Sequence, residues 1–281
     1  MKRITFILLM LVSNFAIAQN LRIITYNIRL NIASDGINAW PNRSDQVCAL
    51  LDFHQAEIFG LQEAKIEQIE DIQAKLTNMK WVGVGRDDGK KAGEFSPIFY
   101  DTEKFKALKN GGFWLSETPD KPGLGWDAAC NRVCTWIILK EGKSGGKFMV
   151  FNTHFDHVGN KARTESAKLI LHKIKELNTD KLPVILMGDF NLTPDKEPIS
   201  VITSELNDSR AISKKAPYGP EGTFNSFNFD APMKDRIDYV FVSDQIEVKR
   251  YAVLTDSKDQ RYPSDHQPVF VNLELKSAKK K

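Results

Sequence analysis

Six short polar motifs border apolar stretches that are expected to form β-strands. They combine carboxylate and amide side chains with histidines, and loops at strand ends are where a rigid sheet directs catalytic groups into one cleft. The motifs are Thr25-Tyr26-Asn27, Leu61-Gln62-Glu63, NTHFDH at 152–157, Gly188-Asp189-Phe190-Asn191, DRIDY at 235–239 and Ser264-Asp265-His266.

Each motif alone is more often a turn former or a helix cap than a ligand set. Together, the oxygen ligands, paired carboxylates and two histidines favour one hard divalent cation facing a phosphate. Phosphoryl transfer needs in-line positioning and charge neutralisation more than covalent help. A histidine that titrates near neutral pH can donate a proton, and a carboxylate behind it fixes its tautomer. The motifs therefore predict metal-assisted hydrolysis of a phosphate ester.

In this order, the motifs resemble those of the endonuclease/exonuclease/phosphatase superfamily, and most closely its nocturnin and deadenylase-like branch. The resemblance extends from Tyr26 to Pro268. It implies an α/β fold, a four-layered sandwich of two mostly antiparallel β-sheets flanked by helices. It also implies a Mg²⁺-dependent hydrolase of phosphodiester or phosphomonoester bonds, with Mn²⁺ as a substitute. The motifs that carry it are Gln62-Glu63, Gly188-Asp189-x-Asn191 and Ser264-Asp265-His266.

The resemblance assigns three residues to the metal. Glu63 is expected to be the main Mg²⁺ ligand, with Asn27 beside it. Asp265 is expected near the ion, as a ligand either directly or through water.

Five further residues receive catalytic roles from the same resemblance. Asp189 is expected to orient or deprotonate the attacking water, and Asn191 to hold that water or the scissile phosphate. His266 would donate a hydrogen bond to the phosphate, and Asp238 would orient His266. His154 would stabilise the developing charge or help to protonate the leaving oxygen.

Substrate binding has three candidates: Glu94, Arg132 and Asp156. Arg132 offers a guanidinium for a phosphate oxygen, and its alternative is a surface salt bridge. Glu94 lies in a segment similar to one that carries a pocket acid in the deadenylase-like branch, with the same alternative. Asp156, in the His-x-Asp-His run that begins at His154, is either a second metal ligand or an acceptor for a substrate hydroxyl.

The elements that must position these side chains are many strands and a few helices without regular βαβ repetition. This pattern favours two packed sheets with helices outside, and periodicity alone does not choose the topology. Helices are expected at 44–54, 66–76 and 161–176. Strands are expected at 21–27, 58–62, 81–86, 96–100, 104–115, 132–140, 147–153, 182–188, 236–242, 247–254 and 267–275.

The N-terminus has the pattern of a secretory signal peptide. Lys2 and Arg3 precede an apolar run at 4–12, and Ala16-Ile17-Ala18 is a cleavage signal. The run is shorter than the roughly 20 apolar residues of a membrane-spanning helix, and a buried N-terminal element is the alternative. We therefore expect a signal peptide at 1–18, one catalytic domain at 19–275, a disordered lysine-rich tail at 276–281 and a secreted or periplasmic protein.

Three cysteines, Cys48, Cys130 and Cys134, are an odd number, so at least one thiol is free or bonded between chains. Residues four apart on one strand lie about 13 Å apart, too far for a disulfide. We expect free and mostly buried thiols.

The charge of the chain bears on its partners. Of 39 basic residues, two precede Gln19 and four lie in the tail, which leaves 33 against 36 acidic residues. Such a body lacks the broad basic surface of most nucleic-acid-binding proteins. The composition therefore favours a small phosphate ester or a short nucleic acid as substrate, with no membrane insertion and a monomer. A nuclease is the alternative within the enzyme class, and a catalytically dead binding module is the alternative outside it.

Overall fold

The structure is a computed structural model that describes residues 19–276. The predicted signal peptide, 1–18, and residues 277–281 of the predicted tail lie outside the described residues. Within the described part, no helix is long and apolar enough to cross a membrane. The expectation about the thiols is confirmed: all three cysteines are free, Cys48 and Cys134 are buried and Cys130 is half-buried.

The first sheet has six strands in the order β11-β12-β1-β2-β4-β3. The pair β1–β2 is parallel and the other pairs are antiparallel. Alternation or continuous runs of Ile, Val, Phe and Leu give these strands their buried faces. The strands are β1 (Gln19–Asn27), β2 (Ile58–Gln62), β3 (Met79–Val82), β4 (Ile98–Asp101), β11 (Ile246–Val253) and β12 (Val269–Leu275).

The second sheet repeats this plan in the order β5-β6-β7-β8-β10-β9. Here β7–β8 is the parallel pair, and the others are antiparallel. The expected mostly antiparallel character is therefore confirmed for both sheets. The strands are β5 (Phe105–Trp114), β6 (Val133–Glu141), β7 (Lys147–His154), β8 (Val184–Asp189), β9 (Asn207–Asp208) and β10 (Asp238–Val242).

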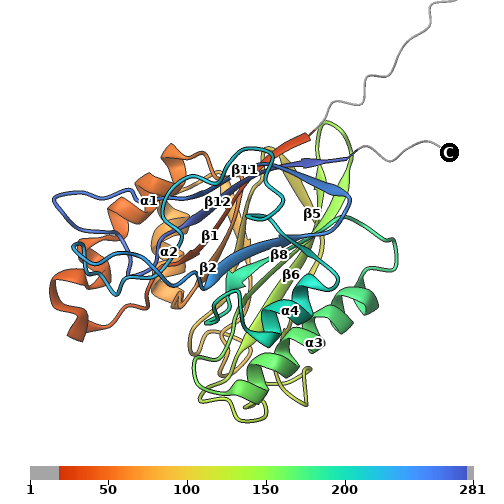
Figure 1. Cartoon of the computed structure of the whole chain (residues 1–281), viewed down its shortest axis with the longest axis horizontal. Coiled ribbons are helices and arrows are strands. Elements are labelled where there is room, and N and C mark those ends of the chain that lie inside the picture. Colours follow the sequence, from red (N-terminus) through yellow and green to blue (C-terminus); the bar gives the residue numbers. More distant parts are fainter. Residues whose placement is uncertain (1–18, 277–281) are drawn as a thin grey trace, which may run out of the picture.

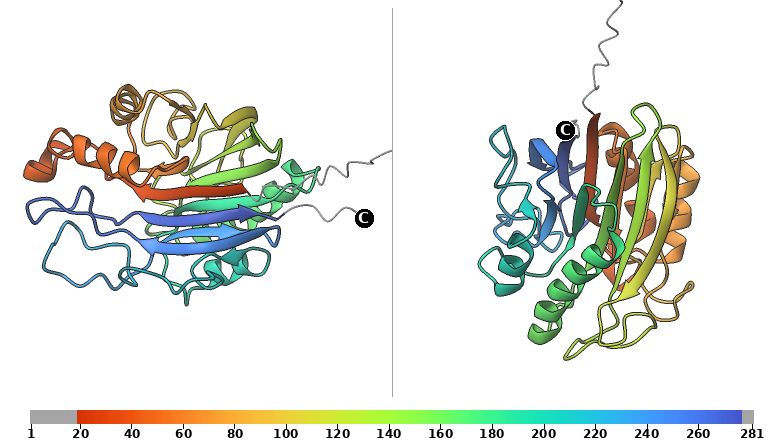
Figure 2. Two further views of the ribbon diagram at one scale, coloured as in Figure 1. Left: turned by 90° about the horizontal axis from the view of Figure 1, so that it is seen from above. Right: turned by 90° about the vertical axis from the view of Figure 1, so that its right-hand side faces the viewer.

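Four helices cover the outer faces of the two sheets (Figures 1 and 2). One buried apolar cluster joins the two sheets face to face, for example Ile58 against Val150. A second joins α1 and α2 to the outer face of the first sheet, and a third joins α3 and α4 to that of the second. This is the expected four-layered sandwich. The helices are α1 (Ser44–Phe53), α2 (Ile66–Lys75), α3 (Asn160–Leu177) and α4 (Glu197–Thr203).

Some elements differ from the prediction. The strand expected at 81–86 is instead β3, which ends at Val82. Gly83 and Gly85 follow, and the chain there turns into a loop. Gly85 packs so tightly in this loop that a Cβ would lie 2.3 Å from the backbone oxygen of Ala92. Helix α4 and the short strand β9 were not expected. The sequence of α4, EPISVIT, is short and rich in β-branched residues, which favour strands.

The topology brings the polar motifs to one edge of the sandwich. Strands β1 and β2 are parallel, so their carboxyl ends lie together, and β7 and β8 do the same in the facing sheet. Strands β10 and β12 run antiparallel to β8 and β1, so they begin at this same edge. Both ends of the described chain lie at the opposite edge, where Gln19 pairs with Leu275 (Figure 1).

Candidate active site

A cavity of about 590 Å³ lies at the edge where the motifs meet. Three of the predicted site residues, Asn27, Asp156 and Asp238, are at most 2% exposed and do not line it. The other eight do, so the structure brings them together as expected. They are Glu63, Glu94, Arg132, His154, Asp189, Asn191, Asp265 and His266.

Asp189, the last residue of β8, lies at the centre of the cavity. Its Oδ2 accepts a hydrogen bond from Asn27 Nδ2 at 2.9 Å. The same oxygen lies 3.5 Å from His154 Nε2 and 3.7 Å from His266 Nε2. Burial and the nearby charge of Asp238 raise the pKa of Asp189 to about 7. The charge of His266 and the hydrogen bond from Asn27 act in the opposite direction but are outweighed. A carboxylate that titrates near neutral pH is suited to exchange a proton with water.

His266 is held by a buried carboxylate. Its Nδ1 donates to Asp238 Oδ2 at 2.9 Å, and Thr223 Oγ1 donates to the same oxygen at 2.6 Å. Nε2 therefore faces the cavity and Asp189. Burial lowers the pKa of His266, but the charges of Asp238 and Asp189 outweigh it and raise the pKa well above the ordinary value. His266 is therefore cationic at neutral pH and can donate a hydrogen bond to an anion.

His154 has the opposite character. Asn191 Nδ2 donates to His154 Nε2 at 3.0 Å, so the ring proton lies on Nδ1, which is 4.0 Å from Glu94 Oε2. Burial, and then the charges of Arg132 and His266, lower the pKa of His154 well below its ordinary value. Of the two expected roles, this geometry favours a neutral hydrogen-bond donor over an acid that protonates the leaving oxygen.

Two acids lie beside this group in a setting that fits a cation. Glu63 accepts hydrogen bonds from Asn27 Nδ2 at 3.1 Å and from the Leu30 backbone at 3.1 Å. Burial raises the pKa of Asp265, and although the charge of His266 lowers it, the charge of Glu63 adds to the increase. Two close carboxylates of like charge, with hard oxygen donors, are an arrangement that a divalent cation stabilises.

Asn27, the other predicted metal ligand, lies beside Glu63. Its Oδ1 accepts the backbone N–H of Arg29 at 3.0 Å, and its Nδ2 donates to both Glu63 and Asp189. The amide therefore connects the two carboxylates, and its oxygen keeps a second lone pair.

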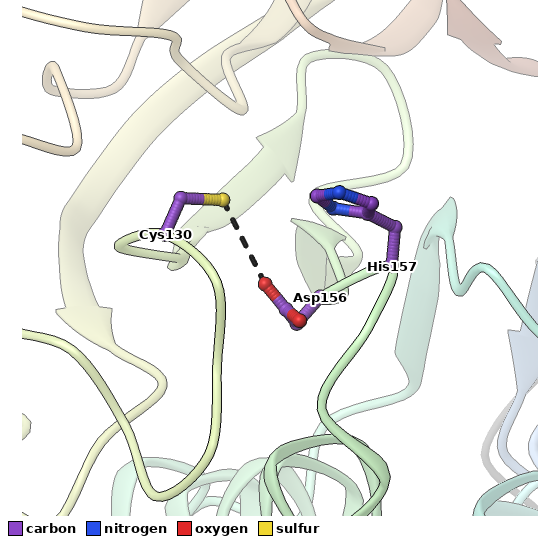
Figure 3. Close-up of side chains that lie close together, drawn as sticks. All are labelled: Cys130, Asp156 and His157. Carbon is purple, nitrogen blue, oxygen red and sulfur yellow. Dashed lines mark hydrogen bonds between the residues drawn. The ribbon is translucent and has the colours of Figure 1, made fainter.

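Two other groups of His, Cys, Asp and Glu side chains in the described chain have ligand atoms within 4.8 Å of one another. The first is Asp189, Asp238 and His266, whose hydrogen bonds are given above. The second is Cys130, Asp156 and His157, drawn in Figure 3. Glu63 and Asp265 belong to neither group.

Five residues that line the cavity, Ser226 and Phe227 among them, have left-handed backbone conformations of the kind that favours glycine, and the other three follow strand ends. These three are Arg29 (φ 53°), Glu63 (φ 59°) and Asn191 (φ 52°). Each follows closely after the carboxyl end of β1, β2 or β8. Strained conformations of this kind cluster at functional sites, where the surrounding structure holds them.

The substrate-binding prediction needs a correction at Asp156. Its Oδ1 accepts the backbone N–H groups of Val158 and Gly159, and its Oδ2 accepts that of Ala129. Burial raises the pKa of Asp156, but these hydrogen bonds and the charge of Arg132 together lower it to about 2. Because the carboxylate is buried and engaged behind the cavity wall, it is poorly placed to accept a substrate hydroxyl.

Arg132 and Glu94 lie on the cavity wall, and neither makes the surface salt bridge that was their alternative. Arg132 is 5% exposed, and its Nε lies 3.6 Å from Asp156 Oδ2. Glu94 Oε2 accepts a 2.7 Å hydrogen bond from Arg86 Nη1. Sequence reasoning missed Arg86, as it missed Arg29 and Thr223, because none of the three lies in one of the six motifs.

The sequence matches the Endonuclease/Exonuclease/phosphatase family over residues 24–266. The chain belongs to this family. Its homologues are hydrolases that act on phosphoester bonds, and the family generally depends on a divalent metal. The match spans all six motifs and every strand except β12 and the first part of β1, and the solved structures share the architecture, so the expected family and fold are confirmed.

Family members of known structure include a mannosyl-6-phosphatase of Bacteroides thetaiotaomicron. It is 42% identical, with a TM-score of 0.87, over 90% of this chain and 99% of that one. The catalytic domain of human Nocturnin shares the fold, at 20% identity and a TM-score of 0.72 over 91% of this chain and 93% of that one. An uncharacterised protein of Acanthamoeba polyphaga mimivirus is 31% identical over 56% of this chain, and this match spans 60% of the viral protein's length.

Proposed function

We propose that this protein is a Mg²⁺-dependent phosphatase of a small phosphate ester, of the sugar 6-phosphate type, that acts outside the cytoplasm. The observation that carries the proposal is the convergence of Asp189, His266 and His154 beside Glu63 and Asp265 in one cavity. The 42% identity to a mannosyl-6-phosphatase over nearly the full length of both chains supports the substrate class.

The residues divide the reaction between them. Asp189 orients the attacking water and takes its proton, which suits a carboxylate with a pKa near 7. His266 donates from Nε2 to a phosphate oxygen, and Asp238 holds the ring in that orientation. Glu63 and Asp265 would hold the Mg²⁺, with Mn²⁺ as a substitute, and the bound ion would neutralise charge on the phosphate.

The charges of the cavity favour a small ester over a long nucleic acid. Each arginine that lines the cavity is within 4.0 Å of a carboxylate: Arg29 of Asp35, Arg86 of Glu94 and Arg132 of Asp156. Nucleic-acid binding depends on free cations that replace the counterions of many phosphates. We also propose that the protein is a monomer.

A substrate panel tests the proposal. The purified protein with Mg²⁺ is expected to release phosphate from mannose 6-phosphate or glucose 6-phosphate, and excess chelator is expected to stop the release. Plasmid DNA and single-stranded oligonucleotides provide the comparison at physiological salt. If the protein nicks plasmid DNA rapidly and releases no phosphate from the sugar phosphates, it is a nuclease and the proposed function is wrong.

Export is a separate prediction. The mature protein is expected to begin at Gln19, within a residue or two, and to be found outside the cytoplasm of its host. Intact mass or N-terminal sequencing of the native protein is the measurement, and a native chain that retains Met1 would rule out cleavage.

A further inference from the structure

Beside the catalytic group, the cavity continues into a polar wall, which we define as Arg86, Glu94, Arg132 and His157. The wall is contiguous with the reaction centre, because His154 Nδ1 lies 4.0 Å from Glu94 Oε2 and His154 Nε2 lies 3.5 Å from Asp189. A phosphate that accepts a hydrogen bond from His266 would lie in the same cavity as this wall, so the rest of its ester would be within reach of the wall.

The polar wall has buried donors with no acceptor. Nε and Nη1 of Arg132 and Nε of Arg86 have no hydrogen-bond partner among the described residues. A buried N–H group without a partner costs free energy, and guanidinium groups can only donate. Arg132 is only 5% exposed and lines the cavity, so an oxygen of a water or of a bound molecule would stabilise its unpaired N–H groups.

The formal charges of the wall are balanced. Arg86 pairs with Glu94 at 2.7 Å, and Arg132 pairs with the buried Asp156 at 3.6 Å. A second phosphate would meet the Glu94 carboxylate beside two guanidinium groups whose charges are already balanced, which weakens any preference for an anion. A hydroxyl group suits such a mixed wall better, because it can accept from a guanidinium and donate to a carboxylate.

We propose that the polar wall binds neighbouring hydroxyl groups of a neutral sugar ring, with Arg132 donating to one hydroxyl and Glu94 accepting from another. The inference rests on the proposed phosphatase function and deepens it, because it assigns the residues that distinguish a sugar phosphate from other esters. Of the aromatic side chains that line the cavity, Phe224 packs against His266 and Phe227 lies near Arg43.

Asp156 and His157 act through Arg132 as positioning residues. Three backbone N–H groups fix the Asp156 carboxylate, which lies 3.6 Å from Arg132 Nε, and Arg132 Nη2 donates to His157 Nδ1 at 3.1 Å. The grouping of Cys130, Asp156 and His157 in Figure 3 resembles a metal site. However, the Arg132 guanidinium contacts two of its three members and supplies the positive charge there.

The test removes single hydroxyl groups from the substrate and the guanidinium group of Arg132 from the protein, separately and together. Rates are measured for wild type and Arg132→Met with mannose 6-phosphate, its 2-, 3- and 4-deoxy analogues, and p-nitrophenyl phosphate. In the wild type, loss of the recognised hydroxyl is expected to lower kcat/KM about 10–100-fold, mainly through KM. In Arg132→Met, loss of the same hydroxyl is expected to lower kcat/KM by less than about threefold, because the substitution has already removed the interaction that the hydroxyl makes. Arg132→Met should also lose more activity on mannose 6-phosphate than on p-nitrophenyl phosphate.

Further variants keep the test decisive if Arg132→Met does not fold, as judged by circular dichroism. Arg132→Lys and Glu94→Gln are expected to show the same loss of selectivity in weaker form, and Asp156→Asn a rise in KM that exceeds its effect on kcat. Arg22→Met, on β1 at the opposite edge of the sandwich, is the matched control.

The outcomes separate the two proposals. A wild type that hydrolyses no sugar phosphate overturns the proposed function. A wild type that hydrolyses sugar phosphates, but whose kcat/KM falls by the same factor for each deleted hydroxyl as that of the Arg132 and Glu94 variants, overturns the polar-wall inference alone. Stoichiometric Zn²⁺ binding that Cys130→Ser abolishes would also overturn it, because the cluster would then hold a metal in place of Arg132.

Discussion

Replacing Glu63 by Gln is expected to abolish metal-dependent turnover, with a loss of about 10³-fold or more at saturating Mg²⁺. Glu63 lies directly after β2 in a left-handed conformation, and its carboxylate faces the cavity with Asp265 nearby. The substitution removes one negative charge, so it weakens cation binding and the charge neutralisation that an ion supplies to the phosphate.

The fold should survive this change. A glutamine side chain keeps the size of Glu63 and one oxygen that can accept from Asn27 or from the Leu30 backbone. Circular dichroism and thermal unfolding are the structural controls, and Glu70→Gln on the exposed face of α2 is the matched charge control. Metal binding can be followed by calorimetry without substrate. Turnover near the wild-type rate would show that Glu63 is not the main ligand.

The second large effect is expected at His266 and Asp238. His266→Ala removes the cationic donor that faces the phosphate, so we expect a loss of about 10²–10³-fold in kcat. Asp238→Ala removes the group that orients the ring, and such changes cost about 10–100-fold. The double variant should be little worse than His266→Ala alone, because the 2.9 Å hydrogen bond makes the pair one unit. If the loss of kcat in the double variant equals the product of the two single losses, Asp238 has a role independent of His266.

Asp238→Asn separates charge from geometry in the same pair. The charge of Asp238 is among the causes that raise the pKa of His266, so its removal lowers that pKa. His266 then loses its proton at a lower pH, and the high-pH limb of the kcat–pH profile is expected to shift to lower pH. An unchanged limb would show that protonated His266 does not limit the rate.

The sequence predicted the site better than its surroundings because catalytic side chains follow strand ends, and strand ends are readable. Asp189 and His154 close β8 and β7, and Glu63 follows β2, so polar residues interrupt apolar runs where the chain leaves the sheet. Whether such ends meet depends on topology, which periodicity does not give. The family resemblance supplied that topology.

What the sequence could not show were contacts made by residues outside these motifs. Thr223 lies in a loop without a predicted strand, yet it donates to Asp238 at 2.6 Å. Arg86 was expected at the end of a strand and lies instead in a loop, where it pairs with Glu94. The function of Asp156 was misread for a related reason, since its three backbone donors belong to two loops that only the fold brings together.

The pairing of β1 with β12 has a consequence for how this chain reaches its native state. Strand β1 lies in the middle of the first sheet, yet one of its two neighbours is β12, the last strand of the described residues. Until β12 emerges, β1 exposes an unpaired hydrogen-bonding edge and apolar side chains such as Ile23 to the solvent. Contacts that span almost the whole chain form slowly, because a long loop must close before they stabilise anything. A nascent chain therefore cannot complete the first sheet until residues 269–275 have been synthesised.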